Sequence, residues 1–550
     1  MMHQPPLSRR TVLMGALAAA TPLPLRPASF LDPRKDGLPD TLDTDLCIVG
    51  AGAAGITLAL NLAGAPLQVL MLESGGMDLE GETQGLYRGL HLGLPYFDLT
   101  ACRLRYFGGT TNHWGGYCRP NDPIDYQGRP ELGVPAWPIG HDDIAPYLRQ
   151  AMADLGLDEA AFDPATQFRL HGHSPDRLAE RRSDQIMTKV FQLSQRVRFR
   201  EIHRRHLEDQ ANLRVLLHAN LTHIALDETG RRVRQLTVRT LDGRQTIVRA
   251  RRVVLACHAI ENARLLLLSD DVMREGIGNA HGHVGRNFME HARIFSGVMI
   301  PARDTFPALY DSGLTGSLNV NTNLSLTETA MRKHGVMEYY CRFVPPDLHE
   351  DMRANLGRLR DGFWQPFDPG LFEDIADVLG DLPEAVAAVM DKYRQTQADA
   401  PYYVLDHRIE QAPNPLSRIV LSRERDALGL RRADLHWALS DLDYATFAKG
   451  CATVAREVAA MGWGRFQLEE ITPDLIQSRV KGHYHHMGTT RMSANSKAGV
   501  VDADLRVHGV ENLFVAGSSV FPTAGYGGPT MTLVALAIRL AEHLKGLGNA

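Results

Sequence analysis

The segment DLCIVGAGAAGITLALNLAGAPLQVLMLESGG, residues 45–76, constrains the fold more than any other part of the sequence. Residues 46–49 form a short apolar run typical of a buried strand, residues 53–63 have a helical composition, and residues 67–72 form a second apolar run that ends at Glu73. The pattern Gly50-x-Gly52-x-x-Gly55 lies between the first run and the helix. This order of strand, glycine loop, helix and strand predicts a Rossmann-like unit that binds a dinucleotide.

Each residue type in this loop has a physical role in such a unit. Gly50 permits the tight turn, Gly52 lets the backbone approach a pyrophosphate, and Gly55 lets the helix pack closely on the strand. The first N–H groups of the helix and its dipole would face the phosphates. We expect the Glu73 carboxylate to accept the ribose hydroxyls and to repel a 2′-phosphate. From these residues alone the cofactor is FAD or NAD.

The composition narrows the class of protein. The 550 residues carry a formal net charge of −5 and are 44% hydrophobic, as is ordinary for a globular protein of about two to four domains. No basic excess points to nucleic acid, and no apolar run reaches the roughly 18 residues that a membrane span needs. We therefore expect no nucleic-acid partner and no integral membrane span.

The N-terminus has the order of an export signal. In SRRTVLMGALAAATPLPLRPA, residues 8–28, the pair Arg9 and Arg10 precedes a short, alanine-rich apolar run. That order resembles a bacterial twin-arginine signal, whose route carries proteins that have already folded around a cofactor. We expect residues 1–39 to be an export signal and linker, and the mature protein to be periplasmic. The alternative is a disordered tail.

Two further glycine-rich segments are suited to contact with a flat ring system. RYFGGTTNHWGGYCRPNDPIDY, residues 105–126, has two Gly-Gly pairs around Trp114, and glycine lets a backbone approach such a ring closely. It could equally be a surface loop. VENLFVAGSSVFPTAGYGGPTMTLVALAIRLAEHLK, residues 510–545, predicts a strand at residues 513–516, a loop, and a helix with Pro529 in its first turn.

The segment GHYHHMGTTRM, residues 482–492, holds His483, His485 and His486. Their spacing of i, i+2 and i+3, with no acid nearby to complete a set of ligands, argues against a metal site. The rings could be packed without a chemical role. They could also handle protons, because imidazole near its ordinary pKa of about 6.5 accepts a proton at neutral pH.

Seven segments together resemble the glucose–methanol–choline (GMC) family of flavoprotein oxidoreductases, and bacterial sugar, polyol and gluconate dehydrogenase subunits in particular. They run in the family's order from residue 45 to residue 545: GAGAAG, GGTTNHWGG, VVLACHAIENARLLLLS, GHVGRNFMEH, EQAPNPLSRIVLS, HHMGTTRM and VVDADLRVHGVENLFVAGSSVFPT. The resemblance implies FAD and an α/β fold with a discontinuous Rossmann-like FAD-binding domain, residues 40–300 and 480–550. It also implies an α+β substrate-binding domain, residues 301–479, built on an antiparallel sheet.

The composition of the intervening region agrees with such a domain. Residues 347–363 and 373–397 have helical patterning, whereas residues 402–411 and 417–422 alternate like strands around a turn.

The resemblance also assigns site residues. In the family the catalytic base is the histidine three residues before the glycine of the G-T-x-R/S-M motif, which here is His485. His486 and Tyr526 are candidates for a second polar residue, because Gly528 stands where the family usually has Asn or His. The motifs place these residues at the cofactor: Gly50, Gly52, Ala53, Gly55, Glu73, Gly108, Gly109, Thr110, Asn112, His113, Gly115, Gly116, Ala516, Gly517, Pro529 and Thr530.

Two further positions stand out against the family pattern. His258 stands where the family commonly has Gly. His113 occupies the position at which pyranose oxidases of the family bind the flavin covalently, but noncovalent relatives also have His there, so the bond is left open.

The leading interpretation is an FAD-dependent dehydrogenase that oxidises a CH–OH group of a sugar, polyol, glycoside or sugar acid. The hydride would pass to flavin N5 with His485 as the base, and the electrons to a cytochrome c or quinone acceptor, with a small partner subunit. One alternative is an oxidase that reduces dioxygen. Another, favoured by Gly528, is a flavin-binding protein with a non-redox role as an isomerase or a structural subunit. A metal-dependent hydrolase is the third.

Overall fold

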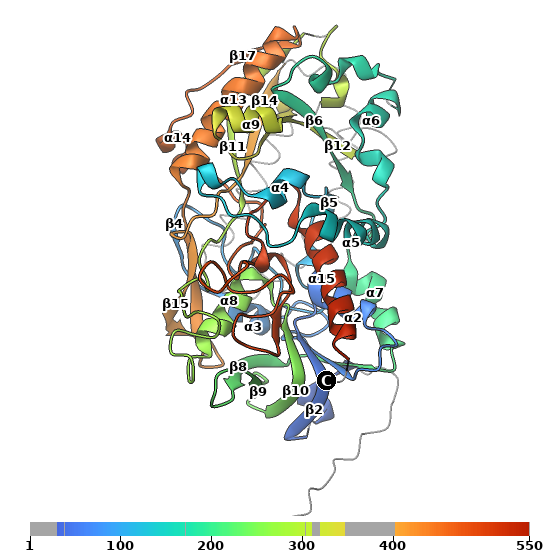
Figure 1. The fold of residues 1–550 in the computed structure, drawn as a ribbon, viewed down its shortest axis with the longest axis vertical. Coiled ribbons are helices and arrows are strands. Elements are labelled where there is room, and N and C mark those ends of the chain that lie inside the picture. Colours follow the sequence, from blue (N-terminus) through green and yellow to red (C-terminus); the bar gives the residue numbers. More distant parts are fainter. Residues whose placement is uncertain are drawn as a thin grey trace, which may run out of the picture.

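The computed structural model describes residues 30–37, 39–170, 172–302, 304–310, 320–346 and 402–548. The described chain has two parts stacked along its long axis, each built on a large sheet (Figure 1). The predicted helices at residues 347–363 and 373–397 lie outside the described residues, and so do the arginine pair and apolar run of the predicted export signal.

The first sheet has the predicted Rossmann-like topology. Its strands lie in the order β1-β7-β3-β2-β10-β9-β8, with β18 beside β10. The pairs among β1, β7, β3, β2, β10 and β18 are parallel, whereas β9 pairs antiparallel with β10 and β8. The bounds are β1 Phe30–Leu31, β2 Thr41–Val49, β3 Val69–Leu72, β7 Leu213–Leu216, β8 Asn220–Leu226, β9 Val233–Arg239, β10 Gln245–Leu255 and β18 Leu513–Val515.

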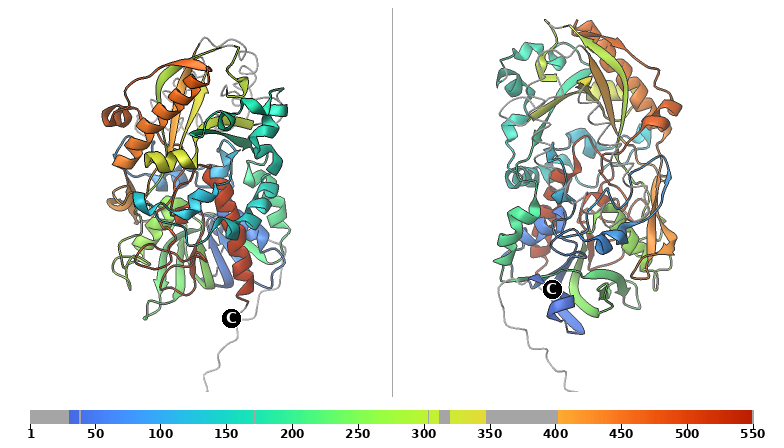
Figure 2. Two further views of the ribbon diagram at one scale, coloured as in Figure 1. Left: turned by 45° about the horizontal axis from the view of Figure 1, so that its top comes forward. Right: turned by 180° about the vertical axis from the view of Figure 1, so that it is seen from behind.

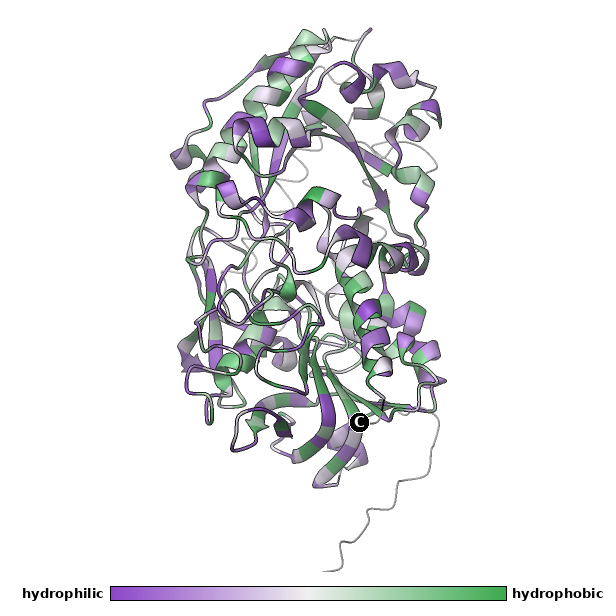
Figure 3. Cartoon of the chain, in the orientation of Figure 1, coloured by the Kyte–Doolittle hydropathy of each residue, from purple (hydrophilic) through white to green (hydrophobic). Residues whose placement is uncertain are grey.

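Burial of apolar side chains explains the centre of this sheet. Strand β2 lies between β3 and β10, and its residues Leu46, Cys47 and Ile48 are at most 1% exposed, as expected for a parallel strand covered on both faces. The central strands are largely hydrophobic in the middle of the molecule (Figure 3). Helices α2 (Ala53–Asn61) and α15 (Pro529–Gly546) pack against one another. The predicted strands and helices at both ends of the chain are therefore confirmed, although β2 begins at Thr41 because its first residues pair with β10.

The second sheet confirms the predicted antiparallel architecture. Its order is β17-β11-β14-β13-β12-β6-β5, and each pair along this path is antiparallel. Helix α13 (Asp441–Ala460) lies across one face of it (Figure 2). The bounds are β5 Tyr117–Cys118, β6 Ile186–Leu193, β11 His291–Pro301, β12 Val320–Leu326, β13 Tyr339–Val344, β14 Tyr403–Glu410 and β17 Gly464–Gln467.

The two faces of the second sheet differ in chemistry because successive side chains on a strand point to opposite sides. On the α13 side, the ring of Tyr339 lies against Gly450 of the helix. On the opposite side, Asp406 and Arg408 form an ion pair of 2.7 Å. On that side Tyr340 also packs edge-to-face against Tyr526, with ring centroids 4.5 Å apart. The polar face of the sheet is therefore turned toward the C-terminal loop of the first part.

The sheets do not follow the predicted boundaries residue by residue. Strands β5 and β6 and most of β11 lie in the second sheet although their residues fall within residues 40–300. Strands β15 and β16 form a separate three-stranded sheet with β4. Within the described ranges, no helix is both long and apolar enough to cross a membrane. The remaining bounds are β4 His91–Gly93, β15 Arg418–Arg425, β16 Arg431–Trp437, α1 Pro33–Asp36, α3 Gly81–Gln84, α4 Pro123–Gln127, α5 His141–Asp154, α6 Pro164–Leu170, α7 Phe199–Glu208, α8 His258–Leu268, α9 Glu328–His334 and α14 Pro473–Arg479.

Candidate active site

The glycine loop after β2 leaves open space in front of a helix. A Cβ atom on Gly50, whose φ is +104°, would lie 2.5 Å from the carbonyl oxygen of Ala256, and a Cβ on Gly55 would lie 1.9 Å from the carbonyl oxygen of Gly50. Both glycines are thus required by close packing. Gly52, the residue that precedes α2, has no atom within 4 Å of the corresponding position. The N–H groups at the start of α2 therefore face a cradle that a side chain would fill, which fits a pyrophosphate.

Glu73 lies at this loop, as predicted. Its side chain is 5% exposed. One carboxylate oxygen accepts the N–H of Ala51 at 2.9 Å, and the other accepts the N–H of Gly75 at 2.9 Å. The oxygen bonded to Gly75 also accepts the Ser74 hydroxyl at 3.2 Å. Because the oxygen bonded to Ala51 has a second lone pair, the carboxylate can hold the loop and still accept a ribose hydroxyl.

The segment at residues 108–116 approaches the same loop. A Cβ on Gly109 would lie 3.1 Å from the Cα of Gly52, so the two glycine segments meet through their backbones. The turn is held by Asn112, whose side-chain amide donates to the carbonyl of Phe107 at 3.0 Å. Burial lowers the pKa of His113 to about 4, so its imidazole is neutral at pH 7.

The C-terminal segment completes this region. Ala516 is buried, and its N–H donates to the carbonyl of Leu255 at the end of β10. Gly517, at φ +105°, has open space at its Cβ position, and α15 begins at Pro529 with a partly exposed Thr530 behind it. The structure therefore brings the three predicted cofactor segments together around the C-terminal ends of β2, β10 and β18.

His485 lies at the exposed edge of the histidine segment. Its ring is partly exposed, and its Nδ1 lies 2.7 Å from Nδ1 of His291. Its Nε2 has no hydrogen-bond partner in the described part of the chain and is not among the buried polar atoms. Burial and the neighbouring His291 lower the pKa of His485 well below the ordinary value, so the ring is neutral at pH 7. A neutral imidazole with one open nitrogen can accept a proton.

His486 points away from this edge. Its side chain is fully buried. Its Nε2 lies 2.6 Å from the hydroxyl of Tyr96, and its Nδ1 lies 3.1 Å from Nε2 of His258. Both ring nitrogens are thus engaged inside the protein. His258 adopts φ +76° at the start of α8, a conformation that costs energy for any residue except glycine.

Glu290 holds the histidine segment in place. Its buried carboxylate accepts the backbone N–H groups of His483 at 3.0 Å, of His485 at 3.1 Å and of His291 at 3.0 Å, and the Tyr96 hydroxyl donates to it. Burial raises the pKa of Glu290 to about 7 in spite of these donors. The sequence motif GHVGRNFMEH contains Glu290 and His291, but neither was predicted as a site residue. An acid next to a histidine within this motif is the signal that could have identified them.

Tyr526 reaches the polar face of the second sheet. Its ring is 1% exposed and packs on Phe191 and Tyr340, with centroids 5.1 and 4.5 Å away. The Nζ of Lys189 lies 4.2 Å from the ring centroid. The hydroxyl is buried and makes no hydrogen bond of ordinary geometry, with Asn323 as a polar neighbour. Burial raises the pKa of this phenol well above its usual value, so it is a donor at pH 7.

Gly528 immediately precedes the start of α15. Its φ of −59° and ψ of 134° are open to any residue. A Cβ atom there would lie 3.0 Å from the carbonyl oxygen of Tyr117, which is tight. Over the described ranges, no group of three or more His, Cys, Asp or Glu side chains is arranged to hold a metal ion.

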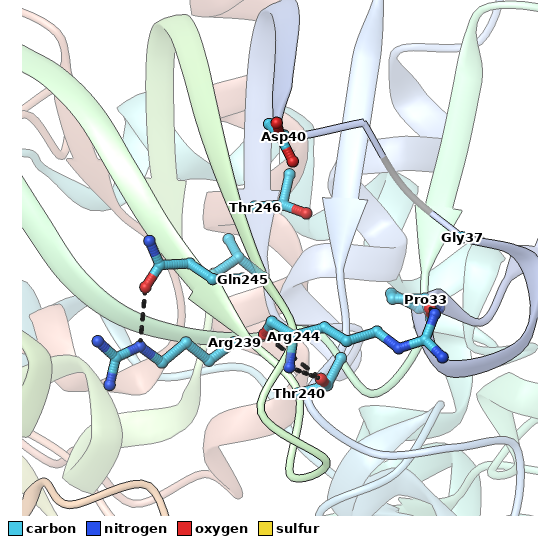
Figure 4. Close-up of a pocket in the computed structure, with 9 residues that line it drawn as sticks. Pro33, Gly37, Asp40, Arg239, Thr240, Arg244, Gln245 and Thr246 are labelled. Atoms are coloured by element: carbon cyan, nitrogen blue, oxygen red, sulfur yellow. Dashed lines mark hydrogen bonds between the residues drawn. The ribbon is translucent and has the colours of Figure 1, made fainter.

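One pocket of the described chain is shown in Figure 4. It is formed by the β9–β10 hairpin and the segment around α1, and its lining includes Arg239, Arg244 and Asp40. Gln245, also in the lining, begins β10, whereas His258 follows the opposite end of that strand. At about 3.3 Å per residue, this separation is about 30 Å, so the pocket takes no part in the site.

Comparisons with known proteins find similarity to oxidoreductases. Two models described as GMC oxidoreductase match residues 197–293 and residues 413–537. The large subunit of fructose dehydrogenase from Gluconobacter japonicus is 22% identical over 92% of this chain and 98% of its own length. The 6'''-hydroxyparomomycin C oxidase of Streptomyces lividus is 26% identical over 96% of each chain. The crystal structure of pyridoxine 4-oxidase from Mesorbium loti superposes with a TM-score of 0.56 at 18% identity, covering 91% of this chain and 98% of that one.

Proposed function

The chain belongs to the GMC oxidoreductase family, and on that premise we propose that it is a dehydrogenase for a CH–OH group of a sugar, polyol, glycoside or sugar acid. As a member of this family it is an FAD-dependent oxidoreductase. Bound FAD supplies the oxidising centre that receives the hydride from the C–H bond. The residues Gly50, Gly52, Gly55 and Glu73, with the segment at 108–116, would hold its dinucleotide part, since they form the open cradle at the start of α2.

The open nitrogen of His485 carries the proposal. A CH–OH group gives up a hydride from carbon only as the hydroxyl proton leaves, and a positioned base accelerates that loss. Nε2 of His485 is the ring nitrogen that remains open in a neutral, partly exposed imidazole. We propose that it accepts the hydroxyl proton of the substrate.

Tyr526 is the better candidate for the second polar residue. The two nitrogens of His486 are already bonded to Tyr96 and His258, so this ring supports the site from behind. The Tyr526 hydroxyl, in contrast, has no hydrogen bond of ordinary geometry in the described chain. We propose that it donates to a substrate oxygen in place of the side chain that Gly528 lacks.

A polar substrate is supported by the polar face of the second sheet. This face carries the ion pair of Asp406 with Arg408 and that of Lys189 with Glu338, at 2.7 Å each, beside the Tyr526 ring. Similarity to a fructose dehydrogenase subunit and to an aminoglycoside oxidase agrees with a polyhydroxylated substrate. The first of these names, which is that of a large subunit, also supports a partner subunit. We further propose that electrons pass through such a subunit to a cytochrome c or quinone in the periplasm.

Anaerobic mixing with sugars, polyols and sugar acids tests the proposal. The flavin absorbance of the purified protein is expected to bleach with at least one of them. Reoxidation by an artificial dye rather than by dioxygen would identify a dehydrogenase, and rapid reoxidation by dioxygen the alternative oxidase. A flavin that no CH–OH compound bleaches would favour the non-redox alternative.

A further inference from the structure

His291 lies directly behind the proposed base. It is the first residue of β11, is 2% exposed, and is bonded at both ring nitrogens. Its Nδ1 lies 2.7 Å from Nδ1 of His485, and its Nε2 lies 2.8 Å from the carbonyl oxygen of Gly525. A continuous series of hydrogen bonds therefore links the Gly525 carbonyl, the His291 ring and the His485 ring, whose Nε2 is open.

The Gly525 carbonyl determines which ring nitrogens of His291 and His485 carry a hydrogen. A carbonyl oxygen only accepts hydrogen bonds, so Nε2 of His291 must carry the hydrogen. Burial lowers the pKa of His291 to about 4 and that of His485 well below its ordinary value, so both rings are neutral at pH 7. A neutral imidazole carries one hydrogen. Nδ1 of His291 is consequently an acceptor, Nδ1–H of His485 is the donor, and Nε2 of His485 is left as a lone pair.

The Gly525 carbonyl is itself fixed. The N–H of Gly525 donates to Glu410 at 3.0 Å, and the other oxygen of Glu410 pairs with Arg129 at 2.8 Å. Both of these side chains are at most 2% exposed. Gly525 adopts φ +65°, and a Cβ there would lie 2.5 Å from the amide of Asn121. The buried ion pair of Glu410 with Arg129 and the close packing of Gly525 on Asn121 thus fix the Gly525 carbonyl oxygen, which orients His291.

We propose that His291 is a positioning residue that fixes the tautomer of His485, so that the nitrogen facing the substrate is the one that can take a proton. The inference rests on the proposed function, because it assigns a role to the ring behind the proposed base. When the substrate loses its hydroxyl proton, the O–H bond breaks and an N–H bond forms at Nε2 of His485. The resulting imidazolium keeps its Nδ1–H donated to His291, which stabilises the charge.

Two substitutions at His291 separate this role from packing. Leucine removes both hydrogen bonds, so either nitrogen of His485 can carry the hydrogen and the ring is free to turn. Glutamine retains one acceptor for His485 and one donor for Gly525. The limiting rate of anaerobic flavin reduction is expected to fall about 10–100-fold in His291→Leu, the scale of the loss when a group that orients a metal-bound histidine is removed. His291→Gln should recover most of that loss, with bound FAD and the substrate dissociation constant near wild type in both variants.

His407→Leu is the matched control. His407 is also a buried histidine of the second sheet, with Nδ1 2.6 Å from the Tyr339 hydroxyl and Nε2 2.8 Å from the carbonyl of Ser296. It lies on the α13 side, away from His485. We expect His407→Leu to lower stability as His291→Leu does, and to leave the rate of flavin reduction unchanged.

The outcomes distinguish this inference from the function on which it rests. If the wild type is never reduced by a CH–OH compound, the proposed function fails. If the wild type is reduced and His291→Leu is reduced equally fast, or His291→Gln is as slow as His291→Leu, the positioning role is overturned alone. If His291→Leu does not fold, His291→Gln decides: a rate within about tenfold of wild type supports the role, and a rate as low as that of His485→Ala overturns it.

Discussion

Gly52→Val is expected to remove FAD and leave the apoprotein folded. The backbone at Gly52, with φ −86° and ψ −166°, is open to valine, and nothing lies within 4 Å of its Cβ position. Replacing a glycine at a compatible position stabilises the folded chain by about 0.4–1 kcal/mol, because the unfolded chain loses freedom. The valine methyl groups would, however, occupy the space in which the pyrophosphate must approach the N–H groups of α2.

The neighbouring Gly55 gives the opposite result. A Cβ there would lie 1.9 Å from the carbonyl oxygen of Gly50. That separation is more than 1 Å shorter than an ordinary contact, so Gly55→Ala should cost about 1–3 kcal/mol or more in folding. Gly546→Val is the control, because Gly546 is also open at its Cβ position and lies at the far end of α15.

The assay compares retained flavin with thermal stability. Wild type should be stabilised by added FAD, by about 2.7 kcal/mol when the free cofactor is at 100 times its dissociation constant. Gly52→Val should elute without flavin absorbance, melt no lower than the wild-type apoprotein, and gain nothing from FAD. Gly546→Val should retain FAD. A folded Gly52→Val protein with a full complement of FAD would refute the assignment of the glycine loop.

Three further predictions concern the pH dependence of stability, the absence of a side chain at Gly528, and export. Burial raises the folded-state pKa of Glu290 to about 7 from 4.5. The contribution of Glu290 to the free energy of unfolding is therefore fully present below pH 4.5 and is lost as the pH rises through 7. In the wild type, the unfolding free energy measured by denaturant should therefore decline by an amount on the order of 3 kcal/mol between pH 4.5 and 7. Glu290→Gln should abolish this decline, and a variant whose unfolding free energy depends on pH as in the wild type would contradict the prediction. Gly528→Asn should fold, after a small shift against the Tyr117 carbonyl, and accelerate flavin reduction by up to about 100-fold if its amide reaches the substrate oxygen; a slower variant would count against that geometry. Replacing Arg9 and Arg10 by lysine should trap the precursor in the cytoplasm, and unchanged localisation on cell fractionation would refute the export signal.

The sequence predicted those parts of the fold that local patterns encode. The strand, glycine loop, helix and strand predicted within residues 46–72 are confirmed because burial and turn geometry act over a few residues. The strands at residues 402–411 and 417–422 appear as β14 and β15 for the same reason. Membership of β5 and β6 in the second sheet was not predicted. It depends on the pairing of β6 with β12, more than 100 residues away, and of β5 with β6, more than 70 residues away. A local sequence pattern does not identify such distant partners.

The candidate site shows the same division. His485 was predicted from its motif, and the structure shows its open nitrogen. The ring orientation of His486 depends on contacts with Tyr96 and His258, which lie 390 and 228 residues away. The roles of Glu290 and His291 likewise arise only when β11 meets the histidine segment. Residue types could be read from the sequence, but the direction of each ring and each proton required the three-dimensional contacts.

The rate of anaerobic flavin reduction in His485→Ala, with bound FAD quantified, tests the central claim most directly. A positioned base contributes about 10²–10⁴-fold, so His485→Ala should retain FAD and lose about that factor. His483→Ala is the matched comparison, because His483 donates its Nδ1–H to the carbonyl of His291 at 3.0 Å and its Nε2 is buried; it should lose far less. If His485→Ala is reduced as fast as wild type by the same sugar or polyol, His485 is not the base and the account is contradicted.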